Sequence, residues 1–144
     1  MSFTIRTMTA RDYDDVLALW KICRGVGLSE SDTVEGVTRF LQANPGLSVV
    51  AFDEDRLVGG VLCGHDGRRG YITHLAVVAD ARGRGLGRKL VERCLAALRR
   101  CRIEKCHIFV FADNADAREF WNASGWTERT ELRVLSRFTD EYDP

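Results

Sequence analysis

The chain has 144 residues, of which 45% are hydrophobic and 29% charged, so it can bury a core but is short for two domains. We therefore expect one domain over residues 1–144. The 21 basic and 21 acidic residues cancel, so the overall charge predicts neither a nucleic acid nor a membrane as a partner. An apolar run of roughly 20 residues and a signal-peptide core are both missing from the sequence, which leads us to expect a cytoplasmic protein.

The cysteines predict neither a disulfide framework nor a metal site. They are odd in number and lack the C-x-x-C spacing of zinc ligands. Several of them lie among apolar residues, where a free cysteine behaves as a small hydrophobic side chain. The sequence therefore predicts no metal, and the cysteines concerned are Cys23, Cys63, Cys94, Cys101 and Cys106.

The first half of the chain predicts a strand, two helices and three further strands. A capping sequence at Thr9 precedes the first helix, and Gly25 and Gly27 follow its end. Asn44 and Pro45 stop the second helix. We expect strands at residues 3–8, 47–52, 57–63 and 71–78, a first helix reaching about Cys23, and a second helix at 33–43.

The second half predicts a long amphipathic helix, a strand, a short helix and a final strand. Apolar residues recur at helical spacing from Leu86 to Cys101. We expect a strand at 107–111, a helix at 114–124 closed by Gly125, and a last strand at 130–138. The order β-α-α-β-β-β-α-β-α-β predicts an α/β (α+β) fold, in which helices flank a mixed, mostly antiparallel central sheet.

A glycine-rich turn joins the fourth predicted strand to the long helix. Gly83, Gly85 and Gly87 stand at alternate positions where the helix begins. Glycine lets the backbone approach a ligand, and the free N–H groups of the first helical turn attract anions. Neither the P-loop nor the dinucleotide-binding fingerprint fits, because Arg88 stands where each motif needs a further glycine. The turn nevertheless predicts a pyrophosphate site built from backbone groups.

The charge distribution around this turn admits two interpretations. Between Arg82 and Lys105 there are nine basic and two acidic residues. Such a run is usually a solvated helix face, but it also suits a small polyanion. The neighbouring glycines favour the second interpretation.

Two motifs resemble those of the Gcn5-related N-acetyltransferase (GNAT) superfamily. The run Arg82-Gly83-Arg84-Gly85-Leu86-Gly87 resembles its R-x-x-G-x-G/A signature. A second pattern of that family, N-x-x-A-x-x-[FL]-Y-x-x-x-G-F, is matched downstream with Trp at two aromatic positions. The spacing of the motifs and the order of elements agree over essentially the whole chain, and the turn at 66–70 resembles that of small single-domain bacterial members. The residues of the second match are Asn114, Ala117, Phe120, Trp121, Gly125 and Trp126.

The resemblance implies acetyl-coenzyme A (acetyl-CoA) as co-substrate. Backbone amides of residues 84–88 would hold its pyrophosphate, and Asn114 would hydrogen-bond the pantetheine. The fourth strand would bulge and offer backbone groups to the pantetheine and the thioester. The cofactor-binding positions implied are Leu75, Ala76, Val77, Val78, Arg82, Gly83, Arg84, Gly85, Leu86, Gly87, Arg88, Asn114, Phe120 and Trp121.

The general acid of the family is not matched. A Tyr that protonates the departing thiolate usually stands at the position of Trp121. An indole N–H donates a hydrogen bond but is not a useful acid near neutrality. Trp121 is thus a catalytic candidate only as a weak hydrogen-bond donor, and packing against pantetheine is the simpler interpretation.

The general base is also unmatched, because the family's glutamate positions hold Tyr71 and Phe109. His74 is a candidate base, since an imidazole titrates near neutrality. Tyr71, ordered water, and the acids Glu30 and Asp32 are the alternatives. Strand alternation predicts that Tyr71 and His74 point to opposite faces of the sheet.

The leading hypothesis is an N-acetyltransferase that moves an acetyl group to a primary amine by direct attack in a ternary complex. The acceptor would be a small-molecule or peptide amine, and a homodimer is compatible with the family. The alternative is a non-catalytic acyl-CoA-binding sensor or regulatory module, since the usual Glu and Tyr are missing. A purely structural glycine-rich domain would require two spaced motifs to agree by chance.

Overall fold

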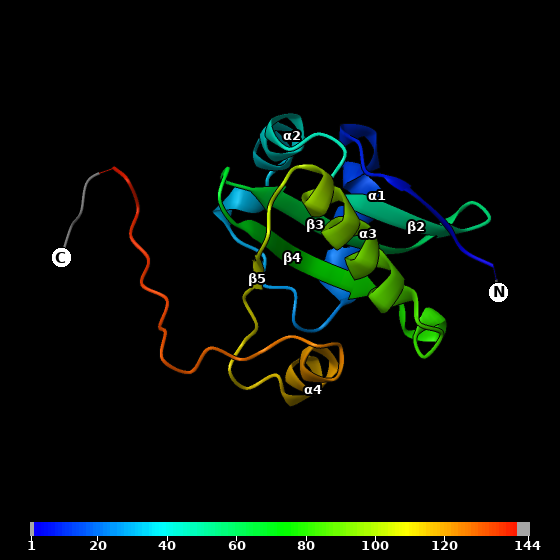
Figure 1. Cartoon of the computed structure of the whole chain (residues 1–144). Helices are drawn as coiled ribbons and strands as arrows, with labels where there is room; N and C mark the ends of the chain where they lie inside the picture. The colour runs from blue at the N-terminus through cyan, green and yellow to red at the C-terminus, as the bar shows by residue number, and fades with distance from the viewer. Residues whose placement is uncertain (1, 141–144) are drawn as a thin grey trace.

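The structure, a computed structural model, describes residues 2–140. Within these residues five strands form one sheet in the order β1-β2-β3-β4-β5 (Figure 1). Neighbours are antiparallel from β1 to β4, whereas β5 lies parallel to β4. The predicted mixed, mostly antiparallel α/β fold is confirmed. The strands are β1 (Thr4–Thr7), β2 (Val49–Asp53), β3 (Arg56–His65), β4 (Gly70–Val77) and β5 (Cys106–Ile108).

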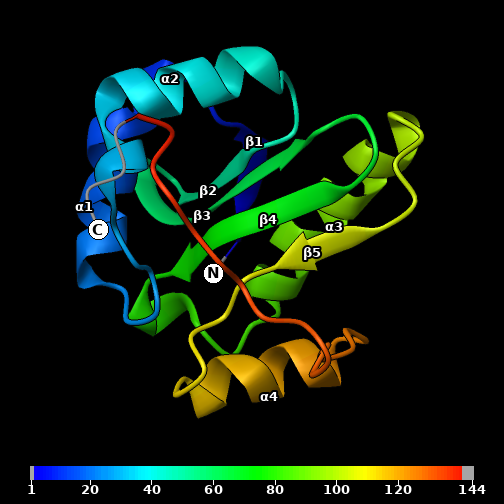
Figure 2. The same cartoon turned by 90° about the vertical axis from the view of Figure 1, so that its left-hand side faces the viewer.

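Helices cover both faces of this sheet, as Figures 1 and 2 show. The first two lie on one face and α3 lies on the other, while α4 sits beyond the free end of β5. Each begins close to its predicted start, and the Thr33 hydroxyl caps the second helix by accepting a hydrogen bond from the Gly36 N–H at 3.1 Å. The α-helices are α1 (Tyr13–Ile22), α2 (Val34–Ala43), α3 (Leu86–Arg100) and α4 (Ala115–Ala123), and the 3-10 helices are η1 (Ala10–Asp12), η2 (Glu30–Asp32) and η3 (Ala79–Ala81).

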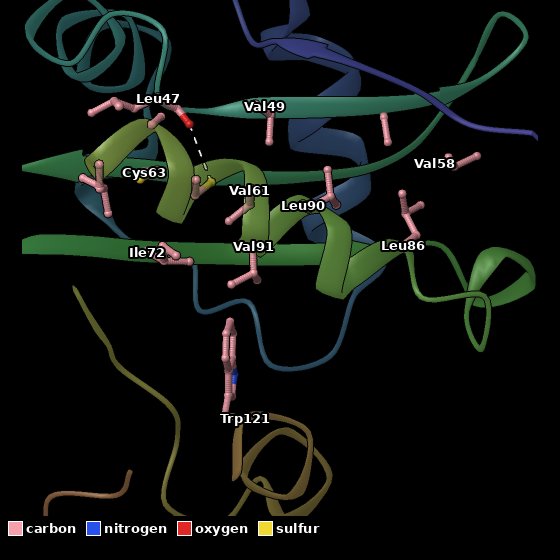
Figure 3. Close-up of a cluster of buried hydrophobic side chains, with 14 of the residues drawn as sticks. Leu47, Val49, Val58, Val61, Cys63, Ile72, Leu86, Leu90, Val91 and Trp121 are labelled. Atoms are coloured by element: carbon pink, nitrogen blue, oxygen red, sulfur yellow. Dashed lines mark hydrogen bonds between the residues drawn. The ribbon is translucent and has the colours of Figure 1, made fainter. Parts of the chain in front are cut away.

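Two buried clusters hold the helices to the sheet. Strand alternation divides β2 between them: Val49 and Ala51 face α3, whereas Val50 faces α1 and α2. The α3 cluster contains the fully buried Leu98 and Leu90, the second of which is labelled in Figure 3. Each buried side chain of this kind contributes roughly 1.5–3 kcal/mol of hydrophobic stabilisation. The amphipathic pattern of the long helix was therefore a reliable guide to this layer.

Glycines let the helices lie close to two strands. A Cβ at Gly70 of β4 would lie 2.6 Å from Leu98 Cδ1 of α3. A Cβ at Gly64 of β3 would lie 2.7 Å from Phe40 Cζ of α2, on the opposite face. Tyr71 pairs with Gly64 across the two strands and follows Gly70 along the chain, so its side chain belongs to the α1–α2 face.

A β-bulge interrupts β4 and corrects the predicted orientation of His74. Gly60 pairs with Ala76 and Leu62 pairs with Thr73, so two residues of β4 oppose one residue of β3. His74 lies in this bulge with a φ of +56°. Its ring contacts Trp20 of α1, with 4.8 Å between ring centroids. His74 and Tyr71 therefore share the α1–α2 face, and the prediction of opposite faces was wrong because the extra residue resets the alternation.

The C-terminal part of the chain differs from the prediction. No strand forms at 130–138 among the described residues, and β5 ends at Ile108 rather than at residue 111. Residues 127–140 are all exposed and run away from the sheet as an extended segment (Figure 1). The alternation of apolar residues there is real, but a strand also needs a neighbouring strand to pair with.

Candidate functional site

The sheet opens between β4 and β5. The two strands pair only from Gly70 to Ile72 on β4, opposite Cys106–Ile108 on β5. From Thr73 to Val77, β4 has β3 on one side and no β5 partner on the other. Backbone N–H and C=O groups on that side are available to an extended ligand, as at any unpaired strand edge. This opening lies directly before the glycine-rich turn.

The glycine-rich turn has the backbone that its sequence predicts. Gly83 and Gly85 have φ values of +77° and +78°, which favour glycine, and Gly85 is the N-cap of α3. The Lys89 N–H donates to the Gly85 carbonyl at 3.1 Å, which closes the first helical turn. The N–H groups of Leu86, Gly87 and Arg88 precede that bond and have no partner within the helix. The turn thus presents a row of donors at the positive end of a fifteen-residue helix.

Basic side chains surround this helix start. Arg84, Arg88 and Lys89 are exposed there. The Arg82 Nε donates to the Val77 carbonyl at 2.9 Å, which ties the turn to the end of β4. Asp80, in the 3-10 helix that precedes the turn, is paired with Arg56 at 2.8 Å. A phosphate at this turn would therefore meet backbone donors and guanidinium groups together.

Asn114 and Phe120 connect α4 to the opening. The Asn114 side-chain carbonyl accepts a hydrogen bond from the Ala117 N–H at 3.1 Å and so caps α4. Its amide nitrogen lies against Gly25 of the α1–α2 loop, where an added Cβ would be 2.6 Å away. The Phe120 ring lies 3.5 Å from the Cβ position of Gly87. The predicted cofactor positions on β4, α3 and α4 thus converge on one region.

Trp121 is a core residue. Its side chain is 9% exposed and extends from α4 toward Val91 and Ile72 (Figure 3). Its ring meets those of Phe120 and Trp126 edge to face, with 5.0 Å between centroids in each pair. This environment makes the ring part of the protein core and does not favour a role as donor to a thiolate; its packing against pantetheine stays a prediction.

His74 and Asp32 form a pair on the α1–α2 side of the opening. The His74 Nε2 lies 2.9 Å from Asp32 Oδ1, and the two side chains are 15% and 8% exposed. The other Asp32 oxygen accepts from the Ser29 N–H at 2.9 Å, within the capping box of η2. The Tyr13 hydroxyl donates to the Asp32 carbonyl at 2.5 Å. The carboxylate is thus fixed by its own short helix and turned toward the imidazole.

The pairing of His74 with Asp32 accounts for the unusual backbone of the β4 bulge. A positive φ at a residue other than glycine costs of order 1–3 kcal/mol and persists only where its surroundings hold it. Asp32 and Trp20 both hold the imidazole in place. The Trp20 Nε1 atom is buried and has no hydrogen-bond partner within residues 2–140. The sequence predicted Asp32 as an alternative to His74, and the structure makes it a partner. The spacing of Ser29 and Asp32, which form a capping box, is the signal that could have shown that Asp32 is held in place. Glu30 is exposed.

Tyr71 lies beside β5 on the same face. Its ring centroid lies 6.3 Å from that of Phe109 and 5.9 Å from that of His107. The aromatic residues thus line the β5 side of the opening, and His74 lies on its α1 side. None of the described residues form a group of three His, Cys, Asp or Glu side chains able to hold a metal.

The buried thiols near the sheet are poor nucleophiles. A hydrogen bond with Cys94, together with burial, raises the pKa of the Cys63 thiol far above its ordinary value. Burial raises the pKa of Cys106 to about 12. Since the thiolate is the reactive form, both residues are inert near neutral pH. The cysteines in the described part of the chain are all free.

Residues 13–126 match the profile of the Acetyltransferase (GNAT) family, and the chain belongs to that family. An acetyltransferase of Pectobacterium atrosepticum is 34% identical over 110 residues, which are 76% of this chain and 77% of the relative. An acetyltransferase of Yersinia enterocolitica has the same identity and coverage. The chain is therefore an acetyltransferase of GNAT type.

Solved structures share the fold. The PaiA N-acetyltransferase of Thermoplasma acidophilum in complex with coenzyme A has a TM-score of 0.75 and 17% identity over 88% of this chain and 91% of that one. The protein AAC(6')-Iy, solved in complex with a bisubstrate analogue, has a TM-score of 0.75 and 17% identity over 96% of this chain and 99% of that one. No helix in the described residues is long and apolar enough to span a membrane.

Proposed function

We propose that the protein transfers an acetyl group from acetyl-CoA to a primary amine by direct attack in a ternary complex. The observation that carries this proposal is the unpaired edge of β4, which leads directly into the glycine-capped start of α3. An extended thioester ligand with a pyrophosphate fits both features at once. The coenzyme A complex of the PaiA relative in fold supports the same co-substrate.

Each part of the co-substrate has candidate groups in the chain. The N–H groups of Leu86, Gly87 and Arg88, with the neighbouring arginines, would bind the pyrophosphate. The unpaired backbone of β4 would hydrogen-bond the pantetheine. A β4 N–H near Val77 would stabilise the negative charge that develops on the carbonyl oxygen. Phe120 would supply an apolar wall, and the Asn114 amide a further hydrogen bond.

The proposed base is His74, held by Asp32. The amine must lose a proton as its nitrogen bonds to the acetyl carbon and the carbon–sulfur bond breaks. With Nε2–H donating to Asp32, the other imidazole nitrogen is free to accept that proton. Asp32 fixes the tautomer and stabilises the imidazolium that forms. Tyr71, on the same face, is the second candidate for contact with the amine.

Direct attack is favoured over an acetyl-enzyme. The inert Cys63 and Cys106 thiols do not offer a nucleophile near neutral pH. Positioning two substrates together is worth about 7–11 kcal/mol of the barrier, so the reaction needs no covalent step to be fast. The bisubstrate analogue bound by AAC(6')-Iy joins donor and acceptor in one molecule, which is consistent with a ternary complex in this fold.

The alternative is a non-catalytic acyl-CoA-binding module. For either function the proposed location is the cytoplasm. The module is favoured by Trp121, which occupies the core where the family has its acid. Both functions predict binding of acetyl-CoA, and only the enzyme predicts turnover. The acceptor is proposed as a small-molecule or peptide amine.

The test combines binding with turnover. Calorimetry with acetyl-CoA and desulfo-CoA measures affinity, and thiol release is followed against amines of different classes. We expect micromolar binding and thiol release with one amine class. Binding without release from any amine would support the module, and no binding would overturn the assignment of the glycine-rich turn.

A further inference from the structure

The opening between β4 and β5 has two sides, and the groups proposed for the pyrophosphate occupy one of them. The start of α3 and the ring of Phe120 lie together, since that ring is 3.5 Å from the Cβ position of Gly87. The candidate base His74 and its partner Asp32 lie on the other face of the sheet, with α1 and α2 (Figure 2). An acceptor that meets the thioester at His74 would therefore come from the α1–α2 face.

A row of aromatic side chains borders the opening on this face. Alternate positions along β5 and the residues after it hold His107, Phe109 and Phe111. The Tyr71 ring centroid lies 5.9 Å from that of His107 and 6.3 Å from that of Phe109. The Phe111 ring continues the row to the α1–α2 loop, where it lies 2.6 Å from the Cβ position of Gly27. The row thus reaches from β4 to the loop.

Exposed apolar side chains gather along the two border segments of the opening, residues 22–34 and 109–114. The first segment contacts the second through Gly27 and Phe111, and it carries Asp32 to His74. Outside residues 127–140, every large hydrophobic side chain that is exposed in the described part of the chain belongs to one of these segments. Such a concentration on a protein surface marks a binding site. The side chains are Ile22, Leu28, Val34, Phe109 and Phe111.

Charged groups on the border segments suit a single ammonium better than several. Asp32 already lies against His74, and its carboxylate complements the one amine that reacts there. The remaining acids, Glu30 and Asp113, are exposed to water, and the same segments hold the basic Arg24. Exposed ion pairs contribute little binding free energy, so these acids would give little affinity for a second ammonium. The aromatic surface is the stronger source of selectivity, because its burial removes apolar area from water.

We propose, on the basis of the proposed function, that the acceptor is an arylalkylamine, a primary amine joined by a short carbon chain to an aromatic ring. Its nitrogen would meet the thioester beside His74, and its ring would lie on Tyr71 and Phe109. Three residues of strand, about 10 Å, separate Tyr71 from His74, which leaves room for two or three carbons between nitrogen and ring. The nitrogen bonds to the acetyl carbon, the carbon–sulfur bond breaks, and the amine proton passes to His74. The products are the N-acetylated arylalkylamine and coenzyme A.

Phe109 is the residue that would select for an aromatic ring. Its side chain is 66% exposed, and its ring is stacked with that of Tyr71 at an angle of 28° between the planes. A substrate ring on Phe109 would remove apolar surface of both groups from water. An amine without a ring would leave Phe109 exposed, so we expect a discrimination of about tenfold or more.

The first experiment compares primary amines by the thiol that they release from acetyl-CoA. The panel contains 2-phenylethylamine, ethylamine as its counterpart without a ring, 1,4-diaminobutane and glucosamine, and kcat/KM is expressed per neutral amine. We expect kcat/KM for 2-phenylethylamine to exceed that for each other amine about tenfold or more. Thiol release with equal rates, or a preference for another amine, would overturn this proposal and leave the proposed function standing. Binding of acetyl-CoA without thiol release from any amine would overturn both.

The second experiment assigns the preference to Phe109. F109A should lower the ratio of kcat/KM for 2-phenylethylamine to that for ethylamine about tenfold, with coenzyme A affinity unchanged by calorimetry. It should fold, because Phe109 is mostly exposed. The matched control is F138A, which removes the same ring from a 70% exposed position outside the border segments and should keep the ratio. An unchanged ratio in F109A, in protein that melts at the wild-type temperature, would show that no substrate ring lies on Phe109.

Discussion

At the scale of single residues, the backbone conformation of His74 distinguishes this site from an ordinary sheet surface. A histidine with positive φ in the middle of a strand is held there by Asp32 and Trp20. Because Asp32 is itself anchored by Ser29, the pair is ordered before any ligand arrives. Such preorganisation is what the proposed base would need in order to act on an amine brought up to a thioester bound at β4.

H74N separates the backbone role of His74 from its chemical role. Asparagine tolerates positive φ, so the bulge and the fold should survive. We expect kcat/KM to fall about 10²-fold or more, because the proton acceptor is lost. Thiol-release kinetics, with calorimetry of coenzyme A binding, measure this loss and check that binding survives.

The control for this prediction is D32N, which keeps the shape of the partner and removes its charge. It should leave coenzyme A affinity unchanged and reduce turnover less than H74N does. If H74N retains the wild-type rate, His74 is not the base, and Tyr71 or ordered water takes its place.

A second residue pair predicts how stability depends on pH. Arg6 donates to both Asp12 oxygens, at 2.8 and 2.7 Å, and this hydrogen bonding holds the pKa of Asp12 below its ordinary value. The stabilisation is complete above the unfolded pKa of about 3.9 and is lost as pH falls through the lower folded value. D12N should cost about 1–3 kcal/mol at pH 7. Urea unfolding at neutral and acid pH measures the difference.

The matched control is D14N on the exposed side of α1. It should change the free energy of unfolding little at either pH. Equal effects of D12N at pH 7 and at a pH below 3 would contradict the assignment, because protonation should already have removed the contribution at the lower pH.

At the scale of elements, the glycines at the start of α3 have different tasks. Gly85 has positive φ, so G85A should cost about 1–2 kcal/mol of stability. Gly87 has helical backbone and room for a Cβ, 3.5 Å from Phe120, so G87A should leave stability unchanged or raise it by about 0.5–1 kcal/mol. Its methyl group would nevertheless stand where the pyrophosphate approaches, and coenzyme A affinity should fall.

Thermal unfolding and calorimetry on the two variants test this division. G87A should be at least as stable as the wild type and bind more weakly. A G87A protein with unchanged affinity would show that the ligand does not approach the helix start closely.

How far the sequence predicted these elements depends on how local each signal is. The glycine-rich turn and α3 were predicted closely, because glycines that favour positive φ and apolar residues at helical spacing are visible within a short stretch of sequence. The bulge at His74 was not, since it arises from the pairing of Gly60 and Leu62 with β4, which a single strand does not encode. The strand predicted at 130–138 shows the same limit: its apolar alternation is visible, but its partner is not in the local sequence.

At the scale of the whole molecule, the sheet opens between its last two strands, β4 and β5. β1 to β4 are joined by long ladders, whereas β5 adds three residues and then diverges. The divergence gives the candidate co-substrate a strand edge to bind, and it also leaves β5 without cover.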